Sequence, residues 1–227
     1  KDSKGRTGQW NQTYRNMAVR TLICALNWAK KQGLISRHCL EAKGVIKTKK
    51  RSRGEEAYVP QIVYDKFIAA VNVNFGELLE VIRRTGCRPA EAYNIEARYY
   101  RPADKIVVYP GHPKPGEFEW KNAGKTGKDR VIYLDDKLVE IVERRIKLQP
   151  EGPVFRTTRN LRWGNEAVST ELRWYAKKLG IKPAPTAYGL RHSFATDWLF
   201  QGGSIKVLAD LMGTSVAMIE KHYGHLQ

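Results

Sequence analysis

The sequence predicts a mainly helical α+β fold with a small antiparallel β-sheet, preceded by one helix from a separate helical unit. Three observations predict it. Apolar residues recur at helical spacing through most of the chain. That spacing gives way to β-branched and aromatic runs only between Lys105 and Leu134. A basic stretch without apolar residues follows the first helix, so we expect a partial helical domain at 1–45, a linker at 46–58 and a main domain at 59–227.

The first predicted element is an amphipathic helix over residues 11–35, with Thr13 as its N-cap and Gly33 as its end. A lone helix cannot bury an apolar stripe, so it belongs to a helical unit whose beginning is missing here or to a neighbouring domain. The chain begins at Lys1 rather than Met, and we therefore expect a fragment. The stripe consists of Met17, Leu22, Ile23, Ala25, Leu26 and Ala29.

The predicted linker carries five positive charges between Lys47 and Arg53, with nothing apolar among them. Such a segment is typical of a solvated tether. Beside a polyanion it would also neutralise phosphates and release counterions.

The main domain is expected to be helical on both sides of its strands. Gly86 favours the left-handed backbone that ends a helix, and Pro89 suits the first turn of the next one. Strands are expected at 106–109 and 131–134, and 117–120 is a candidate for a middle strand. The remaining helices are expected at 60–73, 76–85, 135–148, 165–179, 186–201, 204–212 and 215–223.

Charge indicates the class of partner. Forty Lys and Arg against 23 Asp and Glu give a net charge of +17, which attracts a polyanion, most often nucleic acid. An acidic membrane surface competes with that reading, but we find no apolar stretch long enough to span a bilayer and no signal peptide. Cys24, Cys39 and Cys87 are too widely spaced to indicate zinc or disulfides, so we expect a reducing cytoplasm.

Arg88 is the first candidate functional residue, in the segment Thr-Gly-Cys-Arg-Pro-Ala-Glu at 85–91. It lies where one helix ends and another begins, so its guanidinium projects near a helix N-terminus, and both groups attract an anion. An arginine fork also fits two phosphate oxygens at once. A loop arginine paired with Glu91 is the structural alternative.

Lys125 is the second candidate, in Gly-Lys-Thr-Gly-Lys-Asp-Arg at 124–130, which leads into a strand. A lysine on a hairpin tip can reach a substrate and donate a proton. The segment is not a P-loop, because it lacks the preceding strand and the glycine spacing that hold a nucleotide phosphate. A solvated turn is the alternative.

A third pattern, Thr-Ala-Tyr-Gly-Leu-Arg-His-Ser-Phe, occupies residues 186–194. Thr186 is expected to cap a helix, with Tyr188 and Arg191 three residues apart on its exposed face. The apolar residues of another face are expected in the core: Leu190, Phe194 and Trp198.

The fourth pattern joins Met-Gly-Thr-Ser at 212–215 to the segment 219–225, which contains Tyr223. It combines a tight glycine turn, a short capped helix and a tyrosine near the chain end. A half-buried packing tyrosine is the structural alternative.

In this order, the four patterns resemble those of the tyrosine recombinase (phage integrase) family, over about residues 59–227. Arg88 and Glu91 fit the family's first arginine box, Thr-Gly-x-Arg-x-x-Glu, and Lys125 resembles its hairpin lysine. The resemblance implies a tyrosine-recombinase-like catalytic domain in this region. Residues 13–35 resemble the last helix of the family's core-binding domain.

The two C-terminal boxes resemble the family's with one change each. Tyr-Gly-Leu-Arg-His at 188–192 stands where the family has His-x-Leu-Arg-His, so Tyr188 replaces a histidine. In the last box Thr214 replaces a histidine or tryptophan, and Tyr223 follows it by nine residues, as in the family. An unperturbed phenol with a pKa of about 10 is a poor general base near neutrality. His192 or His225 is therefore an alternative base.

The resemblance implies a site-specific recombinase, cytoplasmic and encoded by a bacterium or phage, that integrates or excises a mobile element or prophage. It would cleave and rejoin DNA through a 3′-phosphotyrosyl bond, and rejoining needs no ATP because the tyrosyl ester keeps the bond energy. No carboxylates are spaced as metal ligands, and we expect neither metal nor cofactor. The implied roles are nucleophile for Tyr223, phosphate clamp for Arg88 and Arg191, proton donor for Lys125, and hydrogen-bond donor for Tyr188 and Thr214.

The resemblance also implies double-stranded DNA as partner, a homo-tetramer on two sites, and accessory DNA-bending proteins. Three rival readings remain. Residues 204–223 resemble a helix-turn-helix, which would make the chain a DNA-binding protein without an activity. An inactive recombinase and a type IB topoisomerase are the other two.

Overall fold

A computed structural model describes residue 10 and residues 12–41 and 58–224 of the chain. The chain forms two compact units, Lys1–Ser52 and Arg53–Gln227. No helix among the described residues is long and apolar enough to cross a membrane. The predicted linker lies outside the described residues except for Tyr58.

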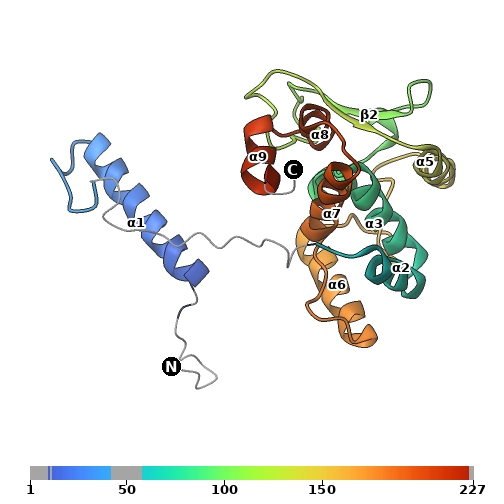
Figure 1. The fold of residues 1–227 in the computed structure, drawn as a ribbon. Coiled ribbons are helices and arrows are strands. Elements are labelled where there is room, and N and C mark those ends of the chain that lie inside the picture. The colour runs from blue at the N-terminus through green and yellow to red at the C-terminus, as the bar shows by residue number, and fades with distance from the viewer. Residues whose placement is uncertain (1–9, 11, 42–57, 225–227) are drawn as a thin grey trace. The chain divides into compact units, whose positions relative to one another are not determined.

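The first unit contains one described helix, α1, which spans Gln12–Lys31 (Figure 1). Its start differs from the prediction, because Thr13 lies inside the helix instead of preceding it. Gly33 follows two residues after the last helical residue with a left-handed φ of 73°, so the helix ends close to the predicted glycine. Large apolar side chains of this helix are exposed: Tyr14, Met17, Leu22 and Trp28.

The second unit combines a small sheet with helices packed beside it (Figure 1). The sheet is antiparallel in the order β1 (Tyr100–Arg101), β2 (Ile106–Tyr109) and β3 (Arg130–Tyr133), with Val107 opposite Ile132. A short 3-10 helix, η2 (Ala97–Tyr99), precedes β1. The helices are α2 (Gln61–Ala70), α3 (Val73–Thr85), α4 (Pro89–Tyr93), α5 (Asp136–Leu148), α6 (Asn165–Leu179), α7 (Ala187–Phe200), α8 (Ile205–Met212) and α9 (Val216–Tyr223).

The candidate middle strand at 117–120 is not a strand, and the third strand is β1 instead. The side chains of this segment pack inward while its backbone pairs with no strand. The backbone N–H of Phe118 donates to the Tyr99 hydroxyl over 3.0 Å, and the Trp120 indole donates to the Pro110 carbonyl over 3.2 Å. The alternation of aromatic residues therefore predicted a strand where the structure has none.

Helices α3 and α7 pack against each other more extensively than any other pair of helices in the described part. Their packing depends on Gly86, which ends α3 with a φ of 61°. A Cβ on this glycine would lie 2.2 Å from the Phe194 ring of α7, so no side chain fits there. The predicted stop at Gly86 is confirmed, and it also lets α7 pack closely against the end of α3.

The apolar core of the second unit has two parts. The larger part contains residues from α2, α3, α4, α5 and α6, from the sheet, and from the start of α7. The smaller one joins the end of α7 to α8 and α9, and it consists of Ala195, Leu199, Leu208, Ala209, Met212, Ile219 and Tyr223. The predicted core residue Leu190 is 2% exposed, whereas Phe194 and Trp198 are partly buried against the smaller cluster. The C-terminal helices thus need further contacts to hold them against the main body.

Candidate active site

The C-terminal end of α8 provides those contacts. A helix end leaves its last carbonyl groups without partners inside the helix. Here Gly213 turns the chain with a φ of 60°, and arginines from three other elements donate to the four carbonyls of residues 210–213. We call these arginines and the carboxylate among them the arginine cluster. Its members are Arg88, Arg130, Arg191 and Glu91.

Arg191 lies on α7 and is 8% exposed. Its Nη2 donates to the Met212 carbonyl over 2.9 Å, and its Nη1 donates to the Gly86 carbonyl over 2.6 Å. Both acceptors are neutral. The expectation that Tyr188 and Arg191 share an exposed face is wrong for the arginine, because α7 turns Arg191 toward the carbonyls that end α3 and α8, whereas Tyr188 is 53% exposed.

Arg88 is the N-cap residue of α4, and its side chain is 11% exposed. It donates from Nη2 to the Gly213 carbonyl over 2.7 Å and from Nη1 to Glu91 over 2.8 Å. The predicted alternative, a pair with Glu91, is therefore present together with a second contact to the last box. The two contacts fix the orientation of the guanidinium.

Glu91 is 1% exposed and accepts from two arginines, at 2.8 Å from Arg88 and 3.1 Å from Arg130. Burial alone would raise its pKa, but the charges of Arg130 and Arg88 and the hydrogen bonds of Arg88 hold the pKa of Glu91 below its usual value. Glu91 therefore carries a negative charge at neutral pH.

Three guanidinium groups and one carboxylate leave the arginine cluster with two unbalanced positive charges. Burial, followed by the charge of Arg88, lowers the pKa of Arg191 to about 10. A buried charge without a counter-ion is unfavourable, and an arriving anion relieves that cost. The cluster is therefore suited to binding a phosphate.

Tyr223 is the last residue of α9 and is 6% exposed in the smaller apolar cluster. Its ring centroid lies 5.0 Å from that of His192. Burial raises the pKa of Tyr223 to about 12, and the nearby charge of Arg191 acts in the opposite direction. The phenol is thus neutral at pH 7 and lies within the electrostatic influence of the arginine cluster.

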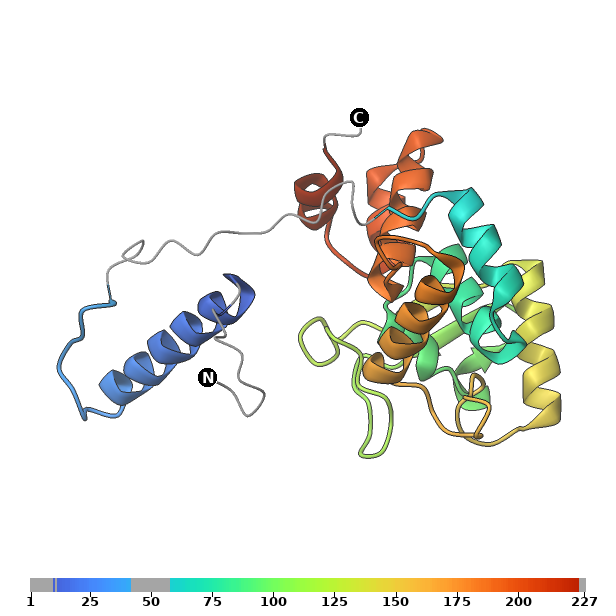
Figure 2. The same ribbon diagram turned by 90° about the horizontal axis from the view of Figure 1, so that it is seen from below.

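The other predicted residues differ in how closely they approach this cluster. Thr214 directly follows Gly213, is partly buried, and donates its backbone N–H to the Ala209 carbonyl over 2.9 Å. Lys125 is exposed in the connection between β2 and β3, which projects in two loops from the body of the unit (Figure 2). No hydrogen bond or ion pair described for residues 58–224 joins Lys125 or Tyr188 to the arginine cluster. His225 lies outside the described residues.

Arg130 was not among the predicted site residues. It begins β3, and its side chain faces the same side as buried Ile132 while Tyr133 is exposed. A charged residue on the inward face of a strand was a signal present in the sequence, because strand residues two apart share a face. The lysines and turn residues that precede Arg130 favoured a solvated turn, so its inward position was not predicted.

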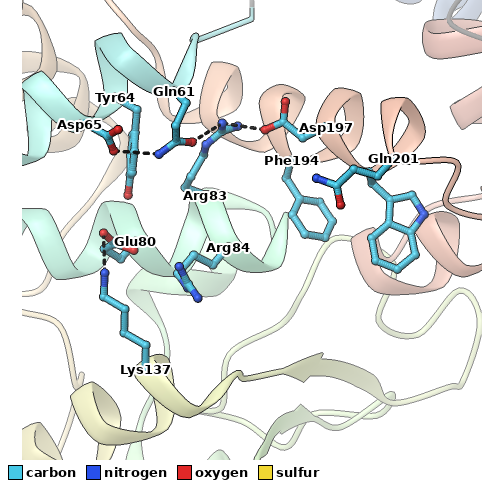
Figure 3. A pocket seen from close by; sticks show the side chains of 11 residues that line it. Gln61, Tyr64, Asp65, Glu80, Arg83, Arg84, Lys137, Phe194, Asp197 and Gln201 are labelled. Atoms are coloured by element: carbon cyan, nitrogen blue, oxygen red, sulfur yellow. Dashed lines mark hydrogen bonds and ion pairs between the residues drawn. The ribbon is translucent and has the colours of Figure 1, made fainter.

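A cavity of about 310 Å³ between α2, α3, α5 and α7 is an alternative location for a site (Figure 3). Its charges are balanced. Arg83 pairs with Asp197 at 2.7 Å, and Lys137 pairs with Glu80 at 3.1 Å. The charged groups that line it are Arg83, Arg84, Lys137, Asp65, Glu80 and Asp197, three of each sign. This cavity therefore has no unbalanced positive charge that would attract an anion.

No group of three or more His, Cys, Asp or Glu side chains in the described ranges is arranged to hold a metal ion.

Comparison with known proteins identifies relatives of the second unit. The family model described as "Phage integrase family" matches residues 59–227. The chain is 29% identical over 159 residues to the tyrosine recombinase XerC of Rhizobium meliloti, covering 67% of this chain and 45% of XerC. It is 34% identical over 95 residues to XerA of Pyrococcus horikoshii, covering 40% of this chain and 33% of XerA. The chain thus spans less than half the length of these curated relatives.

Solved structures share the fold. The Tn1549 transposon integrase, solved in complex with a circular intermediate DNA, aligns with a TM-score of 0.71 at 16% identity, covering 95% of this chain and 76% of that one. The XerA recombinase aligns with a TM-score of 0.58 at 22% identity, covering 77% and 61%. The catalytic domain of bacteriophage HP1 integrase aligns with a TM-score of 0.53 at 17% identity, covering 74% and 87%.

Proposed function

The chain belongs to the phage integrase family, and on that premise we propose that it is the catalytic part of a site-specific DNA recombinase. The observation that carries the proposal is the arginine cluster with its two unbalanced charges beside the buried phenol of Tyr223. A DNA phosphate supplies the missing negative charge, and the phenol supplies the nucleophile.

In the proposed reaction the Tyr223 oxygen attacks a DNA phosphorus and forms a 3′-phosphotyrosyl bond. The bond from phosphorus to the 5′ oxygen breaks, and that oxygen takes a proton from Lys125 to become a 5′-hydroxyl. The phenol loses its proton to a base, for which His192 on α7 is the candidate, since its ring centroid lies 5.0 Å from that of Tyr223. Rejoining is the same sequence in reverse, so no external energy source enters the balance.

Arg88 and Arg191 stabilise the transition state in this proposal. The negative charge on the non-bridging oxygens rises as the phosphorus becomes five-coordinate, and fixed donors in a dry site stabilise such charge strongly. Each guanidinium keeps N–H groups beyond those that hold the helix carbonyls, because an arginine has five and these two use two each in the contacts above. Thr214 and Tyr188 add hydroxyl donors.

Double-stranded DNA is the proposed partner, since the solved Tn1549 integrase and XerH recombinase are bound to DNA in their structures. The net charge of +17 supports the same partner. We further propose that the first unit is part of a core-binding domain, that the intact protein acts in the cytoplasm as a tetramer on two sites, and that DNA-bending proteins assist it.

The helix-turn-helix alternative fits the structure less well. Helices α8 and α9 are present as predicted, with Gly213 in the turn. However, the turn is held by two buried arginines and the partly buried Arg88, and Tyr223 faces the smaller apolar cluster. A DNA-binding motif alone has no use for unbalanced buried charges next to a tyrosine.

The test is covalent trapping of DNA. The full-length protein is incubated with a pool of nicked duplexes of randomised sequence, and SDS-stable adducts are isolated and sequenced to obtain a substrate. Tyr223→Phe should then form no adduct while binding the substrate nearly as well. Tyr133→Phe, at an exposed tyrosine of β3, is the matched control and should react normally. An adduct formed by Tyr223→Phe would place the nucleophile elsewhere.

The topoisomerase alternative predicts a different product. A recombinase exchanges strands between two copies of its substrate, whereas a topoisomerase relaxes a supercoiled plasmid without pairing sites. Plasmids with no, one or two copies of the trapped sequence separate the two activities. Relaxation at equal rates on all three, without recombinants, would overturn the recombinase assignment.

A further inference from the structure

Arg130 is the most deeply buried arginine of the cluster, at 3% exposure. Its Nε donates to Glu91 over 3.1 Å, and its Nη2 donates to the Leu211 carbonyl over 2.8 Å. Its Nη1 donates to the Val131 carbonyl over 2.6 Å and to the Asp210 carbonyl over 3.3 Å. Four of its five N–H groups are therefore committed to the protein, and the side chain has no accessible face for DNA.

Gly213 shows how closely this guanidinium packs. A Cβ on Gly213 would lie 2.7 Å from Nε of Arg130 and 2.9 Å from both Cδ and Cζ. The turn after α8 therefore lies directly against the Arg130 side chain. This packing contact is separate from the hydrogen bonds of Arg130. It places Arg130 against Gly213, whose carbonyl accepts from Arg88.

Arg88 has two anchors, the Glu91 carboxylate and the Gly213 carbonyl. Arg130 contacts both of them, by an ion pair to Glu91 and by packing against Gly213. It thereby connects α4, which bears the first arginine box, to the end of α8, which leads to Tyr223. β3 and α8 are neighbours in the fold, as Figure 1 shows for α8 and the sheet.

We propose that Arg130 is a positioning residue for the strand-transfer reaction: it fixes Glu91 and the turn at Gly213 so that the Arg88 guanidinium faces the DNA phosphate, without contacting DNA itself. The inference rests on the proposed function. A point positive charge cannot replace it, because a lysine ammonium lacks the planar fork that reaches a carboxylate and two carbonyls at once.

Charge explains why the role matters. With Arg130 replaced by glutamine, Glu91 has only Arg88 as a partner, and the carboxylate draws that guanidinium away from the phosphate. The cluster also falls from two unbalanced positive charges to one. A displacement of about 1 Å in such a group is enough to cost about 100-fold in rate.

The experiment measures the rate constant of adduct formation in a single turnover at saturating DNA, together with the dissociation constant for the same duplex. Arg130→Gln should lower the rate constant about 100-fold and leave the dissociation constant within about threefold. Arg130→Lys keeps the charge, and it should still lose at least about tenfold because the fork is absent. If Arg130→Gln does not fold by circular dichroism, Arg130→Lys decides the question.

Arg145 provides the matched control. It lies on α5 with its side chain 11% exposed and forms an ion pair with Glu77 away from the arginine cluster. Arg145→Gln therefore removes a largely enclosed ion pair, 11% and 13% exposed against 3% and 1% for Arg130 and Glu91. It should react within about threefold of the unmodified protein even if it is less stable. A rate loss for Arg145→Gln equal to that for Arg130→Gln would mean that general destabilisation explains both.

A double-mutant cycle separates positioning from an independent contribution. If Arg130 acts through Arg88, adding Arg130→Gln to Arg88→Ala should lower the rate by less than about threefold more, because coupled residues are not additive. Losses that multiply, or an unchanged rate in both Arg130 variants, would overturn the inference while the recombinase assignment stands. No adduct from the unmodified protein, with Tyr223→Phe indistinguishable from it, would instead overturn the proposed function.

Discussion

The arginine cluster and the cavity between α3 and α7 are built from neighbouring parts of the same elements. Arg83 lies on α3 and Arg88 follows it in the next cap, while Arg191 and Asp197 both lie on α7. Arg83 and Arg191 are similarly buried, at 6% and 8% exposure. Burial of an arginine therefore does not distinguish the two places.

Their partners do. Arg83 donates to a carboxylate and an amide, from Asp197 and Gln61, so its charge is neutralised where it lies (Figure 3). Arg191 donates only to carbonyls in the hydrogen bonds described, and its lowered pKa reflects burial beside another cation. The comparison teaches that burial alone does not identify a binding arginine. The charge of Arg83 is neutralised by its own carboxylate, whereas Arg191 is held by neutral carbonyls in a cluster that keeps two unbalanced positive charges.

The sharpest test of this comparison replaces each arginine in turn. Arg191→Ala should cost about 2.7–4 kcal/mol of transition-state stabilisation, as the loss of one oxyanion donor does. Arg83→Ala should leave the chemical step unchanged, because its charge already serves Asp197. Single-turnover rates of adduct formation measure both. Equal losses in the two variants would remove the distinction between the two regions.

The pH dependence tests the state of Tyr223 beside the cluster. Burial raises the pKa of Tyr223 to about 12, above its usual value of 10, so the phenol remains protonated at pH 7. The phenolate fraction grows about tenfold for each pH unit below that pKa, so attack by free phenolate would make adduct formation rise about tenfold per unit between pH 7 and pH 9. If a base such as His192 takes the proton during the attack, as proposed, the rate should rise much less over this range. A full tenfold rise per unit would contradict the proposed base.

Helix positions were largely predictable from the sequence because capping groups and glycines act locally. Gly86 and Thr186 are examples. Gly86 ends α3 with a left-handed φ of 61°, and the Thr186 hydroxyl accepts the Gly189 N–H over 2.9 Å at the start of α7. Strand pairing is not local, which explains why β1 was missed and a strand was expected at 117–120. The sequence also placed Thr13 outside a helix that begins at Gln12.

The site was predictable only in part, for the same reason. Arg88, Arg191 and Tyr223 were selected from motifs, and the structure brings them to the ends of α7, α8 and α9. The carbonyl acceptors at the end of α8 and the link through Arg130 depend on tertiary packing between residues 21 to 125 positions apart in the sequence. No local pattern encodes which helix end an arginine will meet.

A smaller effect is expected when the counter-charge of the cavity is removed. Asp197→Asn leaves the buried Arg83 guanidinium without its carboxylate. The free energy of unfolding should fall by about 1–3 kcal/mol. The loss should stay below the roughly 3–5 kcal/mol that breaking a fully buried ion pair costs, because the Asp197 side chain is 33% exposed. Urea denaturation measures the change. Adduct formation by the folded variant should stay normal, and a lost activity would tie this cavity to the reaction.

The smallest effect is the stabilisation of the DNA-free protein by a simple anion. Two unbalanced charges in the arginine cluster should bind inorganic phosphate weakly, and ligand that binds only the folded state raises the melting temperature. At a concentration ten times its dissociation constant the gain is about 1.4 kcal/mol, which corresponds to a few degrees for a domain of this size. Differential scanning calorimetry in phosphate and in chloride of equal ionic strength gives the shift in melting temperature.

Phosphate also stabilises proteins in general by exclusion from their surface, so the Arg88→Ala/Arg191→Ala double variant serves as the reference. Only the rise in melting temperature beyond that of the double variant reports binding to the arginine cluster. Arg83→Ala should keep that excess. If it loses the excess while the double variant retains it, the anion binds in the cavity and the assignment of the two regions is reversed.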